Sequence, residues 1–167
     1  NSGLYNYYTG YSSENRLFVE NSQFTNNYSG LSQENNSTGS FTGSSFTNND
    51  WVGIYINPYT QLDKSTFTSN NIYNNGDMDV FVGCCWDENA QAEVEMQYSY
   101  WGEETTAEMN DGDNPKNISQ IYDWWDDNNA AQVNYAGWVG GSGGGFTGDV
   151  LLTDSEYNDI GEEYPAG

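Results

Sequence analysis

Histidine is absent from this 167-residue sequence, and only three residues are basic, Arg16, Lys64 and Lys116, against 25 Asp and Glu. The formal net charge at pH 7 is therefore −22. Because nucleic-acid binding depends on clustered Lys and Arg that neutralise phosphates, this composition argues against a nucleic-acid-binding role. We expect the acidic residues to solvate the surface in a saline or calcium-containing medium.

Cysteine is nearly absent as well, with only the adjacent pair Cys84 and Cys85. Two cysteines cannot build a disulfide framework, and a CxxC metal-binding spacing is missing. The pair can form a strained ring disulfide, stay reduced or bridge two chains, and we favour a structural pair at a corner of the chain. No run approaches the roughly 20 apolar residues of a membrane span, so we expect none.

The most informative feature that is present is a repeat. The pattern Ser-x-Phe-Thr-x-Asn occurs three times, at residues 22–27, 44–49 and 65–70. Its phenylalanines, Phe24, Phe46 and Phe67, are spaced by 22 and 21 residues. Periods of this length are typical of solenoids, in which each unit stacks on the previous one and buries a continuous core. We therefore predict that these three phenylalanines stack in one buried line.

The segments between the repeats indicate short strands and tight corners. Residues 80–82 and 94–96 alternate with a period of two, which is typical of strands. Asn, Ser, Gly and Asp fill the intervening corners, where Asn tolerates left-handed backbone and stacked Asn side chains can form hydrogen-bonded ladders. A propeller blade needs roughly 40 residues or more, and a leucine-rich frame is missing. The sequence thus predicts an all-β parallel β-helix.

Beyond Gln97 the character of the sequence changes. Ile118, Ile121, Tyr122 and Trp125 have helical spacing, and they predict a short capping helix near 117–128, with Asn117 as its N-cap. We expect β-helix coils and a closing element over 1–139, a Gly-rich linker over 140–145 and an acidic tail over 146–167.

The order of residues resembles the right-handed parallel β-helix, or pectin-lyase-like, family. The repeats resemble its coils, and the end resembles a closing element of its secreted members through Tyr100-Trp101-Gly102, Thr105, Ile118, Ile121-Tyr122-Asp123, Asp126-Asp127, Val133, Tyr135 and Trp138. The resemblance implies an extracellular or cell-surface protein. Family members include enzymes and binders of polysaccharides as well as purely structural fibres and adhesins, so the fold leaves the function open.

Enzymes of this family supply two kinds of catalytic candidate. Lyases use a Lys or Arg base, for which Lys64 is the only basic residue within a coil, and hydrolases use paired carboxylates. Asp77 and Asp79 are two residues apart, so on a strand they would share a face. Among so many acids such pairs arise by chance, and an outward lysine is usually only solvated. We therefore expect no catalytic site.

Binding candidates are of two kinds. Carboxylate and carbonyl oxygens are the ligands that calcium takes. Two oxygen-rich clusters are candidate calcium sites: Asp111, Asp113 and Asn114, and Asp123, Asp126 and Asp127. Sugar rings stack on exposed aromatic faces. Trp51, Tyr55 and Tyr59 are candidates for such glycan stacking, with core filling as the alternative.

The sequence therefore favours a non-catalytic extracellular β-helix module of a fibre, filament or adhesin, stabilised by calcium and without an organic cofactor. The alternative is a polysaccharide lyase, a glycoside hydrolase or a glycan-binding module. We expect a second copy or a neighbouring domain to dock at the N-terminal coil end, because Gly3-Leu4 begins in the middle of a coil. A polysaccharide is the other expected partner.

Overall fold

The structure is a computed structural model that describes residues 1–8, 16–35, 37–57, 62, 65–83 and 92–140. The described elements, in chain order, are β1 (Ser2–Tyr8), β2 (Arg16–Glu20), β3 (Gln23–Thr25), β4 (Ser29–Asn35), β5 (Thr38–Thr42), β6 (Ser45–Thr47), β7 (Val52–Ile56), β8 (Asn71–Tyr73), β9 (Met78–Val82), β10 (Glu93–Glu95), α1 (Gly102–Asn110), β11 (Ile121–Tyr122) and β12 (Gln132–Asn134).

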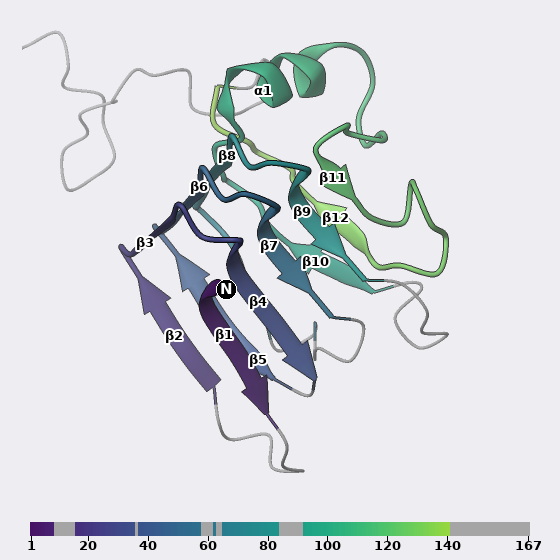
Figure 1. Cartoon of the computed structure of the whole chain (residues 1–167). Helices are drawn as coiled ribbons and strands as arrows, with labels where there is room; N and C mark the ends of the chain where they lie inside the picture. Colours follow the sequence, from purple (N-terminus) through teal and green to yellow (C-terminus); the bar gives the residue numbers. More distant parts are fainter. Residues whose placement is uncertain (9–15, 36, 58–61, 63–64, 84–91, 141–167) are drawn as a thin grey trace, which may run out of the picture.

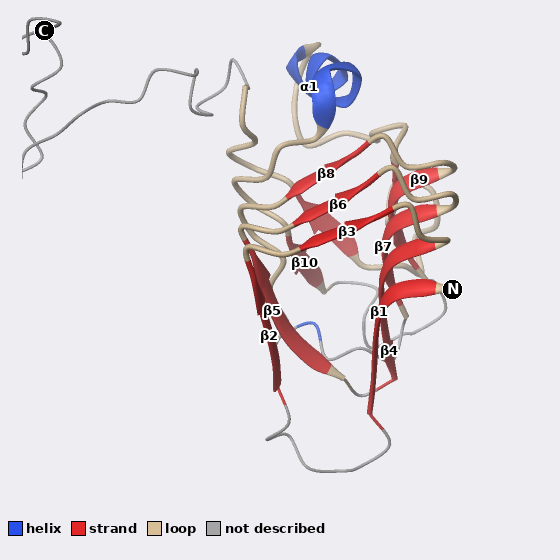
Figure 2. Cartoon of the chain, turned by 60° about the vertical axis from the view of Figure 1, so that its left-hand side comes forward, coloured by secondary structure: helices blue, strands red, loops and turns tan. Residues whose placement is uncertain are grey.

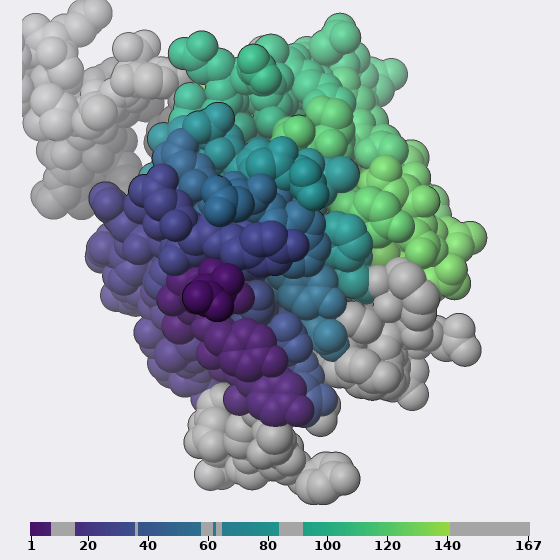
Figure 3. Space-filling model, in the orientation of Figure 1, coloured from purple at the N-terminus to yellow at the C-terminus, as the bar shows by residue number. Residues whose placement is uncertain are grey.

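Every strand pair that the structure describes is parallel, and the pairs join strands that are one coil apart in the chain. The largest sheet, hereafter sheet A, has the order β1-β4-β7-β9-β11, and its strands lie side by side in Figure 1. A second wall is β3-β6-β8, and a third consists of β2-β5 and β10-β12, which are linked by main-chain hydrogen bonds of Thr66 and Phe67. Figure 3 shows the coils following one another along the molecule, from β1 at one end to α1 and β12 at the other. The predicted all-β parallel β-helix is thus confirmed.

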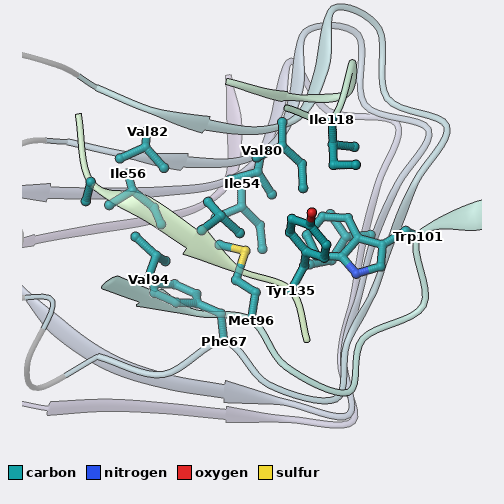
Figure 4. Packing of buried hydrophobic residues seen from close by; sticks show 14 of the residues in the cluster. Ile54, Ile56, Phe67, Val80, Val82, Val94, Met96, Trp101, Ile118 and Tyr135 are labelled. Atoms are coloured by element: carbon teal, nitrogen blue, oxygen red, sulfur yellow. The ribbon is translucent and has the colours of Figure 1, made fainter. Parts of the chain in front are cut away.

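The hydrophobic core fills the space between these walls. On sheet A, Leu31, Ile54 and Val80 are opposite one another in consecutive strands, and all three are fully buried. Figure 4 shows side chains of β7 and β9 meeting Val94 and Met96 from the opposite wall, with Trp101 and Tyr135 at one end. Burial of apolar area in every coil is the main stabilising contribution, at about 25 cal/mol per Å².

The predicted line of three phenylalanines is wrong in its third member. Phe24 pairs with Phe46, and their rings stack at 5.1 Å. The next residue in that column is Ile72, which lies 26 residues after Phe46. Phe67 stacks instead on Phe41, at 5.2 Å, on a neighbouring wall. The step from Phe46 to Ile72 is longer than the 22-residue step from Phe24 to Phe46, so the third copy of the sequence pattern falls one strand earlier.

The predicted helix over 117–128 is also wrong, since this stretch forms turns and β11, and Asn117 caps no helix. The described helix is α1, which packs on the end of the coils beside β8 (Figure 2). Gly102 begins α1 with a φ of +77°, and Thr105, Thr106 and Met109 form its buried face. Ile118 and Ile121 are both buried, but a tight turn joins them, so their spacing of three reflects a turn. No described helix is long and apolar enough to cross a membrane.

Candidate functional site

An aromatic band crosses the outer face of sheet A. Tyr55, Phe81 and Tyr122 are opposite one another on β7, β9 and β11. Trp51 contacts both Tyr55 and Phe81, at 5.7 and 6.0 Å between ring centroids, and stacks on Tyr28 at 5.3 Å. We call these five residues the aromatic band. Two of the predicted glycan-stacking residues, Trp51 and Tyr55, thus lie together, whereas Tyr59 is outside the described residues.

The orientation of the rings decides what the aromatic band can bind. Phe81 and Tyr122 are parallel, at 4.5 Å, so they cover each other's faces. Trp51, Tyr55 and Phe81 are tilted by 34–41° against one another and are half-buried, so part of their faces remains open. Tyr28 is 53% exposed at one end of the band. Tyr28, Phe81 and Tyr122 were not among the predicted glycan-stacking residues, although the alternation within residues 80–82 places the Phe81 side chain on the outside.

A ladder of asparagines runs along one corner of the coils, as predicted. The main-chain N–H and the side-chain Nδ2–H of Asn27 both donate to Oδ1 of Asn49, at 3.1 and 3.4 Å. Asn49 donates in the same way to Oδ1 of Asn75, at 3.0 and 2.9 Å. Asn75 then donates to Oδ1 of Asp79, at 3.3 and 2.8 Å. The ladder therefore ends on a carboxylate.

Glycines explain why the ladder ends there. A Cβ on Gly3, Gly30 or Gly53 would lie 2.6–2.9 Å from Nδ2 of the Asn in the next coil, so each Asn needs a glycine beneath it. Asp79 occupies the position after Gly53 in this column. Beyond it the chain leaves the coil path at Gly102 and enters α1. The Asp79 side chain thus takes the place of the next asparagine.

The ladder's end is the most perturbed acid among the described residues. Burial raises the pKa of Asp79 to about 7, although the two hydrogen bonds from Asn75 oppose this rise. Asp79 also lines a cavity of about 470 Å³, together with Glu103, Glu104 and Gln120. A buried acid whose pKa is raised to near neutrality and that lines a cavity is a candidate general acid. Asp79 itself is only 1% exposed, however, while its predicted partner Asp77 is exposed.

The predicted calcium clusters are placed differently from each other. Asp111, Asp113 and Asn114 lie together on an exposed turn, but Asn114 Nδ2 donates to the main-chain oxygen of Met109 and its Oδ1 accepts from Tyr135 Oη. In the part of the chain that the structure describes, no three acidic or cysteine side chains gather closely enough to hold a metal ion. Calcium binding stays a prediction.

The second cluster has one buried member. Asp123 is 2% exposed, and its carboxylate accepts hydrogen bonds from the main-chain N–H groups of Trp125 and Val133, at 3.0 and 2.8 Å. Burial raises the pKa of Asp123 despite these bonds. Asp126 and Asp127 lie on the same turn. Asp123 therefore holds the turn onto β12.

The parallel coils, the inward columns and the corner ladder describe one architecture, and a family comparison agrees with it. A model of the family described as "Right handed beta helix region" matches residues 2–124. The chain belongs to this family. Its β-helix match covers the aromatic band, the Asn ladder, Asp79 and α1. No curated protein and no solved structure gives a significant match. The remaining candidates, Lys64, Cys84 and Cys85, lie outside the described residues.

Proposed function

We propose that this chain is a non-catalytic extracellular β-helix module that serves as a structural element of a surface. The observation that carries the proposal is the continuity of side-chain contacts between coils. Phenylalanines stack in the core, asparagines bond along a corner, and the aromatic band crosses the outside. Each of these contacts stiffens the stack of coils, which is what a rod-like scaffold requires.

The arrangement around Asp79 supports a structural role over catalysis. Its carboxylate accepts hydrogen bonds from the main-chain N–H and the side-chain Nδ2–H of Asn75 and has little exposed surface. A general acid must reach the leaving group of its substrate, within about 2.6–3.2 Å or through one water. The Asp79 carboxylate is instead hydrogen-bonded to Asn75 within the protein. Asp77 is exposed and does not line the cavity.

Turnover assays test this role. Wild type and Asp79→Asn are incubated with uronans and with neutral glycans, and reducing ends and unsaturated products are measured. The proposal expects no turnover by either protein. Turnover by the wild type that disappears in Asp79→Asn, while the variant remains folded, would instead establish a polysaccharide-active enzyme.

Assembly and calcium are tested by electron microscopy of the full chain, with and without a chelator. The proposal expects ordered filaments or surface arrays, and their loss on chelation would assign calcium to the acidic clusters. Dispersed particles under all conditions would contradict the fibre and filament form of the proposal. An adhesin module would then remain.

A second candidate function is glycan binding by the aromatic band. It is favoured by the open, tilted faces of Trp51 and Tyr55 and by the exposure of Tyr28. The charge of −22 favours a neutral glycan over a uronan. Titration with neutral oligosaccharides should quench tryptophan fluorescence in the wild type and not in Trp51→Ala. Trp124→Ala is the matched control, because Trp124 is an exposed tryptophan on the turn after β11. Equal quenching in both variants would refute binding at the band.

A further inference from the structure

The turn between β11 and β12 presents two adjacent tryptophans to solvent. Trp124 and Trp125 are each 39% exposed, and their rings meet edge to face, with centroids 5.2 Å apart at 81°. In a perpendicular pair, one ring places its edge on a single face of the other, so the remaining ring faces are not covered within the pair. The parallel Phe81–Tyr122 pair of the aromatic band does cover them. Indole faces are therefore available on this turn.

The turn is held in place from within. The Asp123 carboxylate accepts from the main-chain N–H groups of Trp125 and Val133, as described above. The main-chain oxygen of Asp123 accepts from the N–H groups of Asp126 and Asp127, both at 3.0 Å. Trp124 N–H donates to the main-chain oxygen of Ala131, at 3.2 Å. A surface fixed before binding loses less conformational entropy when a ligand arrives.

Two carboxylates, those of Asp126 and Asp127, follow the tryptophans on the same turn, and neither has a cationic partner among the described residues. Among the described residues, the Asp126 carboxylate accepts from Asn117 Nδ2 and from the main-chain N–H of Asp123, at 3.3 and 3.2 Å. Asp127 accepts through Oδ1 from the main-chain N–H and the Nδ2–H of Asn129. All these donors are uncharged, and each carboxylate oxygen has two lone pairs, so acceptor capacity remains.

No cationic side chain from the described part of the chain contacts the tryptophans or the carboxylates of this turn. The one cation–π contact among those residues is Arg16 over Phe18, at 5.4 Å. Lys116 directs its Nζ to the main-chain oxygen of Asp111. An exposed indole face attracts a cation through the quadrupole of the ring, and a nearby carboxylate attracts it through its negative charge.

We propose that the Trp124–Trp125 turn binds an arginine side chain of a basic partner protein segment. A guanidinium group is planar, stacks on indole and forks onto a carboxylate at the same time, which matches indoles beside Asp126 and Asp127. A small quaternary ammonium ion is a poorer fit, because two rings on an open turn do not enclose it. The net charge of −22 attracts a basic segment and repels an acidic one. This site is independent of the aromatic band and of the proposed structural role.

The test uses the full chain and three synthetic peptides with the repeat Gly-X, where X is arginine, lysine or citrulline. Citrulline keeps the shape of arginine without its charge. Binding is followed by NMR, through the indole Nε1–H signals of Trp124 and Trp125, in about 0.15 M salt, where charges farther apart than about 8 Å are largely screened. The arginine peptide should shift these two signals and bind more tightly than the lysine peptide. The citrulline peptide should not bind.

Variants separate a specific site from general attraction to an acidic protein. Trp124→Ala and Trp125→Ala should each weaken binding of the arginine peptide by about 2- to 30-fold, the range of a cation–π contact. Trp124→Phe and Trp125→Phe keep an aromatic face and should lose less, which guards against a folding defect. Asp126→Asn should weaken binding, and Trp51→Ala, on the aromatic band, should not. Equal binding of arginine and lysine peptides, or equal losses in Trp51→Ala, would overturn the proposal.

Discussion

Replacing Asp79 by asparagine should remove a pH-dependent weakness from the fold. The pKa of Asp79 rises from 3.8 to about 7 on folding because the carboxyl group is buried. Between these values the folded chain still holds a proton that the unfolded chain has lost. The contribution of protonated Asp79 to the free energy of unfolding is therefore fully present below about pH 3.8 and is lost as the pH rises through about 7.

The size of the effect follows from the same pKa values. At about 1.36 kcal/mol per pKa unit, the ionised carboxylate costs on the order of 4 kcal/mol above pH 7. The asparagine side chain of the variant would keep an acceptor oxygen for Asn75 and carry no charge. Asp79→Asn should therefore be more stable than the wild type at pH 8, by up to about that amount, and similar at pH 4. For a chain of this size the difference corresponds to roughly 10 °C in Tm.

The assay is thermal unfolding followed by circular dichroism from pH 4 to pH 8 at constant salt. Asp77→Asn is the matched control, because it removes the same charge from an exposed position two residues away. Its stability should follow that of the wild type at each pH, apart from a small constant offset. If Asp79→Asn and Asp77→Asn show the same pH profile, or if the wild type is as stable as Asp79→Asn at pH 8, the reasoning about burial is refuted.

Three further predictions concern the coils, and thermal or urea unfolding checks each of them. Gly53→Ala should destabilise the fold strongly, since its Cβ would lie 2.6 Å from the main-chain oxygen of Asp79 and 2.7 Å from Asn75 Nδ2; an unchanged midpoint would contradict the close packing of the ladder. Asn75→Ala should cost a few kcal/mol, because it removes donors to Asp79 and to the Phe46 main-chain oxygen and leaves buried partners unsatisfied. Phe46→Ala should cost about 3–5 kcal/mol and Phe24→Ala clearly less, as Phe46 is fully buried and Phe24 is only partly so; equal costs would contradict the end position of Phe24.

Sequence reasoning predicted the parallel coils because the repeat carries both the period and the corner chemistry. A left-handed backbone at Asn26, Asn48 and Asn74 recurs once per coil, with φ values of 55–58°, and the ladder follows from neighbouring asparagines. The position of Phe67 was not predictable from the repeat alone. A coil can lengthen at a corner, so the register depends on which residues face each other across neighbouring strands. Ile72, which is not part of the repeated pattern, is the residue that lies opposite Phe46.

The closing region was predicted less well, for a physical reason. Residues 117–128 have helical spacing, but Asp123 draws the main chain into a turn by binding two N–H groups. The actual helix, α1, is polar and has no side-chain cap, so its only usual sequence signal is the acidic pair Glu103 and Glu104 in the first turn. In the sequence, Asp79 stands out only as half of an acid pair. Its structural role depends on the glycine column at Gly30 and Gly53, which becomes meaningful only once the coils are in register.

The central claim is that Asp79 ends the asparagine ladder of a structural β-helix. The most direct test is an NMR titration that follows the Asp79 carboxyl carbon together with the Asn75 side-chain amide signals. The account predicts that Asp79 titrates at about pH 7 and that the Asn75 Nδ2–H signals move with the same midpoint. A carboxyl group that titrates near its ordinary value of 3.8, or an Asn75 amide that does not respond to its ionisation, would contradict it.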